Sequence, residues 1–310
     1  MRGTTAPRAH LGRNASALAL GLGLAACVAS DPAPMANQPP ERTAEAPVQE
    51  ARSALRTAKA DRSQEKPAAP VLINAIDAPP APSPIPAITI ASPRPDQAIP
   101  RERAADFEVQ LQAQGWPAKG GGRLHVVLDN RPFKAVEAPQ GKLRLGDIAA
   151  GAPLQEGRHV LVAFPADEKH LALQPAGRRP PAAVVAFWIG PEGTAAFRAT
   201  DPLLVFNLPA GTYSGPDADA IHLDFHVLNA DLGPGKYSVH ATVTPPVGDA
   251  RSITIHRAQP FQLVNLPGGQ SRVHLELRDP NGVIVPGPWN SVDRTITVQR
   301  APSTEVSRSP

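Results

Sequence analysis

The sequence predicts an all-β protein in which two β-sandwiches follow one another along the chain. From about Ile88 onward, short runs alternate apolar and polar residues between Gly, Pro, Asn and Asp, as in strands with one buried face. The 38 prolines among 310 residues argue against a mostly helical protein, because proline blocks helix interiors. The order of the runs also repeats: Phe107 matches Phe225 and Leu145 matches Leu263, with an offset of 118 residues. These observations predict a duplicated β-domain.

The N-terminus, residues 1–26, has the layout of a secretory signal peptide. Arg2, Arg8 and Arg13 precede an apolar run from Ala15 to Ala26, which is too short to span a bilayer as a helix. We therefore expect this segment to direct export and to be removed.

The end of this segment, Leu24-Ala25-Ala26-Cys27, resembles the bacterial lipobox. The resemblance implies that Cys27 is lipidated and becomes the first residue after cleavage, which would attach the chain to a membrane. The alternative is a plain signal peptide with a chance cysteine. Cys27 is the only cysteine of the chain, so no disulfide is expected. Val28 follows it, and by resemblance to lipoproteins of two-membrane bacteria, the lack of Asp there favours the outer membrane.

The net charge of +3 suggests nucleic-acid binding only until the signal peptide is set aside. Removing its three arginines from the 31 basic residues leaves 28, which equals the number of acidic residues. A neutral mature chain has no overall electrostatic attraction for DNA or RNA. We therefore expect no nucleic-acid partner.

Residues 27–87 are predicted to form a disordered tether rich in Ala and Pro. Twelve of the sixty residues from Val28 to Ala87 are proline and none is aromatic. Such a segment cannot bury enough apolar surface to offset the entropy of ordering it. Its expected role is to give the following domains reach from the membrane.

The first sandwich is expected over residues 88–192 and the second over 198–300, with a disordered tail at 301–310. Each half holds a similar series of strand-like runs. The first half reads AITIASP, ADFEVQLQA, GRLHVVLDNRP, KLRLGDI, EGRHVLVAFPADE and AAVVAFWI; the second reads LLVFNLPAGTYSG, LDFHVLNADL, GKYSVHATVTP, PFQLVNLPGG, SRVHLELRDPNG and RTITVQ. About 100 residues in short strands is the size of an immunoglobulin-like (Ig-like) sandwich.

Lipobox, proline-rich tether and paired Ig-like domains together resemble lipoproteins of Gram-negative bacteria that have no assigned activity. The resemblance covers most of the chain. It implies an exported, envelope-located protein but no chemistry, because sandwich folds carry many functions.

The stretch IHLDFHV, Ile221 to Val227, holds the best candidate for a chemical site. Alternation on a strand places His222, Asp224 and His226 on one face, and a His-x-His pair with a carboxylate can bind zinc or copper. The alternative, which the sequence favours, is the solvated face of an ordinary strand. The matching stretch of the first half, AADFEVQ, has no histidine, so the fold does not require these side chains.

Two weaker candidates remain. His125 and His159 lie on different strands of the first half and would form a second metal pair if those strands placed them side by side. The favoured alternative is that His159, at the start of GRHVLV, is a hydrogen-bonded edge residue. Trp116 and Trp289 lie in loop-like segments, where aromatic side chains either bind a protein or glycan partner or close the ends of the sandwiches.

The sequence shows none of the common catalytic patterns: no G-x-S-x-G, no P-loop and no paired carboxylates. We therefore expect a non-catalytic binding or structural protein of the cell envelope, without a cofactor. The alternative function is a periplasmic zinc or copper protein that uses His222, Asp224 and His226.

Overall fold

A computed structural model of the chain describes residues 69–78, 85–116, 122–137, 140–174, 181–194 and 197–300. The predicted signal peptide, Cys27, the tether up to residue 68 and the tail lie outside the described residues. Within them, strands dominate, and the helical elements are the short η1 (Arg101–Arg103), α2 (Leu145–Ile148) and η2 (Gly215–Ala218). The all-β prediction is confirmed.

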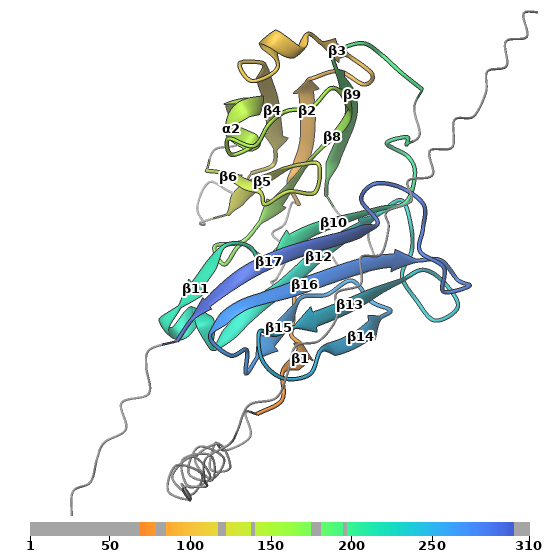
Figure 1. Cartoon of the computed structure of the whole chain (residues 1–310). Coiled ribbons are helices and arrows are strands. Elements are labelled where there is room, and N and C mark those ends of the chain that lie inside the picture. Colours follow the sequence, from red (N-terminus) through yellow and green to blue (C-terminus); the bar gives the residue numbers. More distant parts are fainter. Residues whose placement is uncertain are drawn as a thin grey trace, which may run out of the picture. The chain divides into compact units, whose positions relative to one another are not determined.

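Sandwich 1 consists of β2 to β9 (Figure 1). One sheet has the order β2-β4-β7, and the other has the order β3-β9-β8-β5-β6. The bounds are β2 (Ala87–Ser92), β3 (Ala98–Ile99), β4 (Glu108–Gln114), β5 (Arg123–Leu128), β6 (Lys134–Val136), β7 (Gln140–Arg144), β8 (Gly157–Ala166) and β9 (Ala183–Ile189).

Sandwich 2 consists of β10 to β17 together with β1. Its sheets have the orders β1-β15-β12-β10 and β11-β17-β16-β13-β14. The bounds are β1 (Leu72–Ala75), β10 (Leu203–Leu208), β11 (Thr212–Ser214), β12 (Ala220–Leu228), β13 (Ser238–Thr244), β14 (Arg251–Ile255), β15 (Phe261–Val264), β16 (Gly269–Arg278) and β17 (Ser291–Gln299).

The two sandwiches share one topology, so the predicted duplication is confirmed. In each, a first strand crosses from one sheet to the other and its second part pairs in parallel with the last strand: β3 with β9, and β11 with β17. The remaining pairs are antiparallel and follow the same order. This arrangement is an Ig-like sandwich.

Strand β1 corrects the predicted extent of the tether. It lies within residues 27–87 but pairs antiparallel with β15 of sandwich 2, from Leu72 opposite Val264 to Ala75 opposite Phe261. Val71 is 7% exposed within the core of sandwich 2, and Ile73 packs against that core. These two apolar side chains provide the burial that the surrounding Ala- and Pro-rich sequence lacks. Sandwich 1 is therefore inserted, in sequence, between two strands of sandwich 2.

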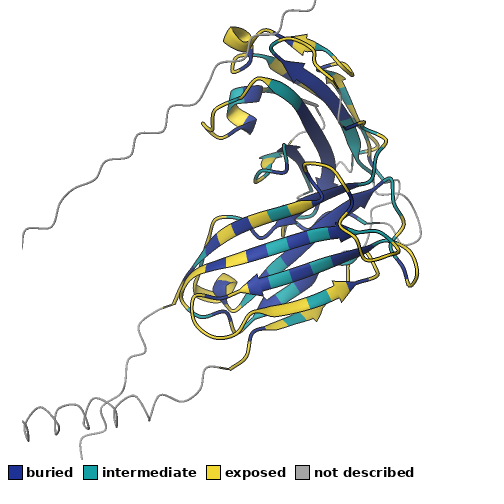
Figure 2. Ribbon diagram, turned by 45° about the vertical axis from the view of Figure 1, so that its right-hand side comes forward, coloured by how far each residue is buried: buried dark blue, intermediate teal, exposed yellow. Residues whose placement is uncertain are grey.

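Each sandwich has its own core between its two sheets. Strand β16 alternates buried and partly exposed residues, as expected for a strand with one solvated face. In contrast, β8 is buried from His159 to Ala166, and every residue of β10 is buried. Figure 2 shows the difference as mixed colours on the first kind of strand and continuous dark blue on the second. Strands buried on both faces indicate a further layer of packing.

Within the described residues, no helix is long and apolar enough to cross a bilayer.

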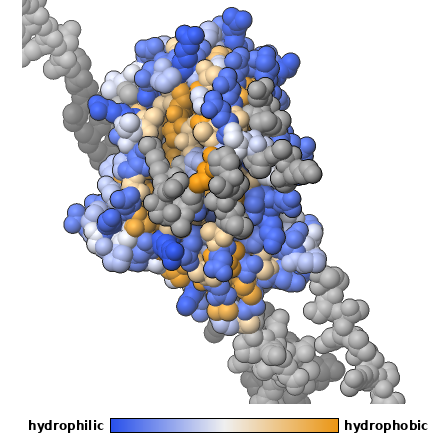
Figure 3. Space-filling view, turned by 180° about the vertical axis from the view of Figure 1, so that it is seen from behind, coloured by the Kyte–Doolittle hydropathy of each residue, from blue (hydrophilic) through white to orange (hydrophobic). Residues whose placement is uncertain are grey.

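The face in Figure 3 is largely hydrophilic, and its apolar residues gather mainly in its upper middle and at its lower end. Large apolar side chains with substantial exposure are Leu72, Val247, Val283 and Ile284.

Candidate functional site

Strand β12 places His222, Asp224 and His226 on one face, as the alternation predicts. The other face, which includes Leu223 and Phe225, lies in the core of sandwich 2. The polar face is not solvated, however, because Asp224 and His226 are both 0% exposed. The interpretation of this stretch as the wet face of a strand is therefore wrong.

Sandwich 1 covers this face. Outward side chains of β8, including Val160, Val162 and Phe164, pack against the outer face of β10 and β12. We call this contact the interdomain cluster; its buried members are Val127, Val160, Val162, Phe164, Ala172, Ala186, Phe197, Leu203, Val205, Leu228 and Trp289. Burial of apolar surface on this scale favours docking of the two sandwiches.

A chain of hydrogen bonds crosses the contact beside this cluster. The Asp224 carboxylate accepts a bond from the Ala172 backbone N–H (2.9 Å), and a second from Asn207 Nδ2 (2.7 Å). Asn207 Oδ1 lies 2.9 Å from His125 Nδ1, and His125 Nε2 lies 2.9 Å from His170 Nδ1. Asp224 and Asn207 belong to sandwich 2, whereas the other three residues belong to sandwich 1. The chain thus ties the sandwiches together through defined polar contacts.

His226 lies in the same contact without a hydrogen-bond partner for either ring nitrogen. Its ring meets Phe164 edge-on, with ring centroids 4.6 Å apart. Burial lowers the pKa of His226 to about 3, because a charged imidazole has no water or counter-ion there. Burial likewise lowers the pKa of His125 to about 3, and it raises the pKa of Asp224 to about 7. Burial therefore favours the uncharged form of all three groups.

The geometry gives the zinc or copper hypothesis no support. Within the described residues, no three His, Cys, Asp or Glu side chains are arranged to hold a metal ion. The Asp224 oxygens are already used by N–H donors, including Gln174 Nε2 at 3.3 Å. His222 remains partly exposed at the margin of the contact. The structure therefore identifies none of these residues as a metal ligand.

The proposed pair of His125 and His159 is not formed. The register places His125 opposite Phe164 on β8, whereas His159 lies further along that strand, opposite Phe187 on β9. His159 instead contacts the Asp129 carboxylate through Nδ1 (2.6 Å) and the Gln155 carbonyl through Nε2 (2.8 Å). The metal-pair prediction was wrong because β5 and β8 pair antiparallel, which places His125 near one end of their paired region and His159 beyond the other end. The hydrogen bonds of His159 agree with the alternative of a hydrogen-bonded edge residue.

The two tryptophans are also placed differently from the partner-binding hypothesis. Trp289 is 4% exposed and belongs to the interdomain cluster. Trp116 is partly buried and packs against the core of sandwich 1. The packing of Trp116 agrees with the other alternative, in which loop aromatics close the ends of the sandwiches. Trp289 packs between the two sandwiches, which neither alternative predicted.

Arg294 and Asn130 form a clasp between the sandwiches that the sequence did not reveal. Arg294, on β17, is 7% exposed, and its guanidinium donates to the carbonyls of Phe206 (2.5 Å) and Asn207 (2.6 Å) in sandwich 2. It also donates to the carbonyls of Asn130 and Arg131 in sandwich 1. One signal in the sequence could have indicated this role. Arg294 lies in the inward-facing row of β17, together with the apolar residues Ile296 and Val298.

The Asn130 side chain completes this clasp from the other side. Its Nδ2 donates to the carbonyls of Leu204 (2.9 Å) and Trp289 (3.1 Å), and its Oδ1 accepts from the Phe206 N–H (2.7 Å). Asn130 adopts a positive φ of 53°, which Asn tolerates better than most residues. Its side chain satisfies both donor and acceptor groups at the edge of β10, and this fixes the contact geometrically.

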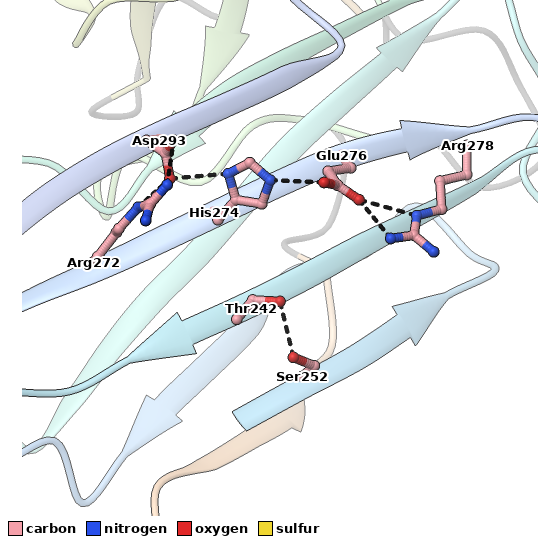
Figure 4. A network of polar contacts seen from close by, with 7 residues as sticks. All are labelled: Thr242, Ser252, Arg272, His274, Glu276, Arg278 and Asp293. Carbon is pink, nitrogen blue, oxygen red and sulfur yellow. Dashed lines mark hydrogen bonds and ion pairs between the residues drawn. The ribbon is translucent and has the colours of Figure 1, made fainter. Parts of the chain in front are cut away.

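The outer face of β16 and β17 carries a row of charged side chains (Figure 4). Asp293 pairs with Arg272 through both oxygens (2.5 and 2.8 Å) and accepts from His274 Nδ1 (2.9 Å). His274 Nε2 contacts Glu276 (2.9 Å), which also binds Arg278 at 2.6 and 3.0 Å. Arg272 and His274 hold the pKa of Asp293 below its usual range, the guanidinium being the stronger influence. The result is an ordered, solvent-facing row of alternating charge.

The sequence matches no family model and no curated protein. Similar solved structures include the fibronectin(III)-like modules of Clostridium thermocellum CbhA, with 12% identity over 69% of this chain and 94% of that chain, and a TM-score of 0.24. Two others are the tandem V-type regions of VCBP3, a v-region-containing chitin binding protein (10% identity, 69% and 99% covered, TM-score 0.23), and a two-domain fibronectin type-III segment of chicken tenascin (11%, 68% and 98%, 0.20). At these values they add nothing to the fold assignment, which rests on the strand order.

Proposed function

We propose that the chain is a lipid-anchored protein of the bacterial cell envelope, and that its two docked sandwiches act together as a non-catalytic binding or structural module. The observation that supports the location is the motif Leu24-Ala25-Ala26-Cys27, with the single cysteine of the chain at the position that lipidation requires. Val28 after the cysteine supports sorting to the outer membrane. A tether to about residue 70 would then give the module reach.

The contact between the sandwiches supports the proposal that they work as one body. Docking uses the outer face of β8 and the outer face of β10 and β12, and the Arg294–Asn130 clasp fixes it with directional bonds. Binding to a partner benefits from such rigidity, because no domain motion has to be frozen on association.

For a protein or glycan partner, the charged row on β16 and β17 is a better candidate surface than the two tryptophans, which are packed inside the molecule. Its side chains already hold one another in place by hydrogen bonds. A preorganised polar surface loses little side-chain entropy when a polar partner binds.

The location is tested by expressing the full chain in a Gram-negative host beside a Cys27→Ser variant. We expect the unchanged chain to stay with the membrane after high-salt washing and to take up radiolabelled palmitate. The variant should lose the label and leave the membrane fraction. A Val28→Asp chain serves as a control for sorting and should keep the label while moving to the inner membrane. A Cys27→Ser chain that kept both label and membrane association would refute the anchor.

A further inference from the structure

His125 and His226 are enclosed between the two sandwiches, one contributed from each side. His125 is 0% exposed and stacks on Phe133 with ring centroids 3.6 Å apart. His226 is equally buried and packs on Phe164. Neither histidine contacts a carboxylate directly, whereas His159 in the same sandwich does. Two imidazoles are therefore held where a positive charge has no compensation.

The hydrogen-bond chain fixes where the proton of His125 lies. Asn207 Nδ2 donates to the Asp224 carboxylate and to the His170 carbonyl (2.7 Å), so Asn207 Oδ1 must face His125 as an acceptor. His125 Nδ1 consequently carries a hydrogen, and its Nε2 accepts one from His170 Nδ1. A second proton on His125 would break this link between the ring nitrogens unless His170 moved its hydrogen from Nδ1 to Nε2.

We propose that acidification separates the two sandwiches, because His125 and His226 must stay uncharged while the contact encloses them. The docked form then dominates near neutral pH. Once the sandwiches part, both imidazoles reach water and take up protons. Protonation of the separated form shifts the equilibrium away from the docked form, and neither sandwich has to unfold.

Other titratable groups around the contact modify this response. On sandwich 1 they are Arg123 on β5 and Asp167, Lys169 and His170 after β8; on sandwich 2 they are His222, Asp224 and Arg294. Burial lowers the pKa of His170 and of His222, which acts in the same direction as His125 and His226. Asp224 opposes them, since its raised pKa makes the docked form take up a proton as the pH falls below 7.

Proton counting gives the expected steepness. Between about pH 6 and pH 4, separation takes up two protons at His125 and His226, releases one from Asp224, and gains a further contribution from His170 and His222. A net uptake of at least one proton lowers the docking constant about tenfold or more per pH unit. Asp224→Asn removes the opposing proton and should make the fall about tenfold steeper per unit. His226→Leu removes one of the protons taken up and should make the fall about tenfold shallower per unit.

Trp289 reports the contact directly, because it is buried in the interdomain cluster. The experiment follows its fluorescence and its quenching by acrylamide from pH 7.5 to 4, in a full chain carrying Trp116→Phe and Trp188→Phe. Far-UV circular dichroism checks that the strands persist. Hydrogen exchange at the Phe206 amide, which donates to Asn130 across the contact, gives a second readout in the chain with its native tryptophans.

The expected result is exposure of Trp289 and faster exchange at Phe206 below pH 6, with the strand signal retained. His256→Gln, at an exposed histidine of sandwich 2, is the matched control and should keep the original steepness. If His226→Leu does not fold, His226→Gln supplies the same loss of a titrating group. A contact that stays closed down to pH 4, or a His226 variant with unchanged steepness, would overturn the proposal.

Discussion

The outer faces of β8 and β16 occupy the same place in the same fold, yet one is covered by a second domain and the other faces water. The register aligns the two sheets: Gly157 lies opposite Ile189, which pairs with β3, and Gly269 lies opposite Val298, which pairs with β11. Val160, Val162 and Phe164 therefore correspond to Arg272, His274 and Glu276. Side-chain chemistry on the outer face, and not the sandwich itself, decides whether the sheet docks.

The faces of β4 and β12 show the same contrast in reverse. Beyond an irregularity in each pairing, Gln110 lies opposite Ser92, and Asp224 lies opposite Leu208. Glu108, Gln110 and Gln112 of β4 are exposed, whereas their counterparts on β12 are mostly buried beneath sandwich 1. Sandwich 1 therefore docks through the outer face of β8, and sandwich 2 docks through the outer face of β12.

Among substitutions that test the contrast between docked and solvent-facing surfaces, we expect Arg294→Met to cause the largest loss of stability. The substitution leaves carbonyl groups of both sandwiches without their donor in a buried place, and we expect it to lower the free energy of unfolding by about 3 kcal/mol or more. Urea denaturation measures the change. Arg278→Met is the matched control on the exposed row, and it should cost less than about 1 kcal/mol. Equal losses for the two arginines would contradict the assigned role of the clasp.

Exchanging residues at one matched position should give an intermediate effect. Val162→His places an imidazole in the interdomain cluster, where it finds no solvent, and a loss of about 2 kcal/mol is expected. The reciprocal His274→Val removes two solvent-facing contacts on β16 and should change stability by less than about 1 kcal/mol. Thermal melting of both variants compares their losses of stability. A greater loss for His274→Val would contradict the assignment of β8 as the docked face and β16 as the solvent-facing one.

The smallest effect concerns the pH response of the charged row. Arg272 lowers the pKa of Asp293, so the stabilisation this carboxylate contributes is present above its usual pKa and is lost as the pH falls through the lowered value. Asp293→Asn should therefore cost a little stability at pH 7 and nothing once the pH has fallen through the lowered pKa and the carboxylate of the unchanged chain is protonated. Denaturation curves of both chains over a series of falling pH values measure this difference. A difference that stays constant over the whole series would contradict an ionised Asp293.

The alternation of apolar and polar residues was enough to predict the strands, their duplication and the shared face of His222, Asp224 and His226. It could not predict that this face is buried, because the covering residues lie on β8, more than fifty positions earlier. The sequence match of Phe107 with Phe225 also misplaced the repeat on this strand: the register makes Leu111 the counterpart of Phe225. Register depends on the pairing of strands that lie far apart in the sequence. The order of residues along one chain therefore predicts it only in part.

The composition of β8 gives a partial indication that the domains dock. The run from His159 to Ala166 is apolar on both faces of β8, which is more than one sandwich core requires. Such a run does indicate a strand buried on two sides. The clasp was harder to foresee, since an arginine in an inward position usually signals an error in the assumed alternation.

Strand β1 gives the module a mechanical property. Tension on the N-terminal segment reaches the folded body first at β1, whose four residues pair with β15. Once this short seam parts, the 17 residues from Val71 to Ala87 can span at most about 56 Å, at about 3.3 Å per residue. We therefore expect β1 to yield under load before the rest of sandwich 2.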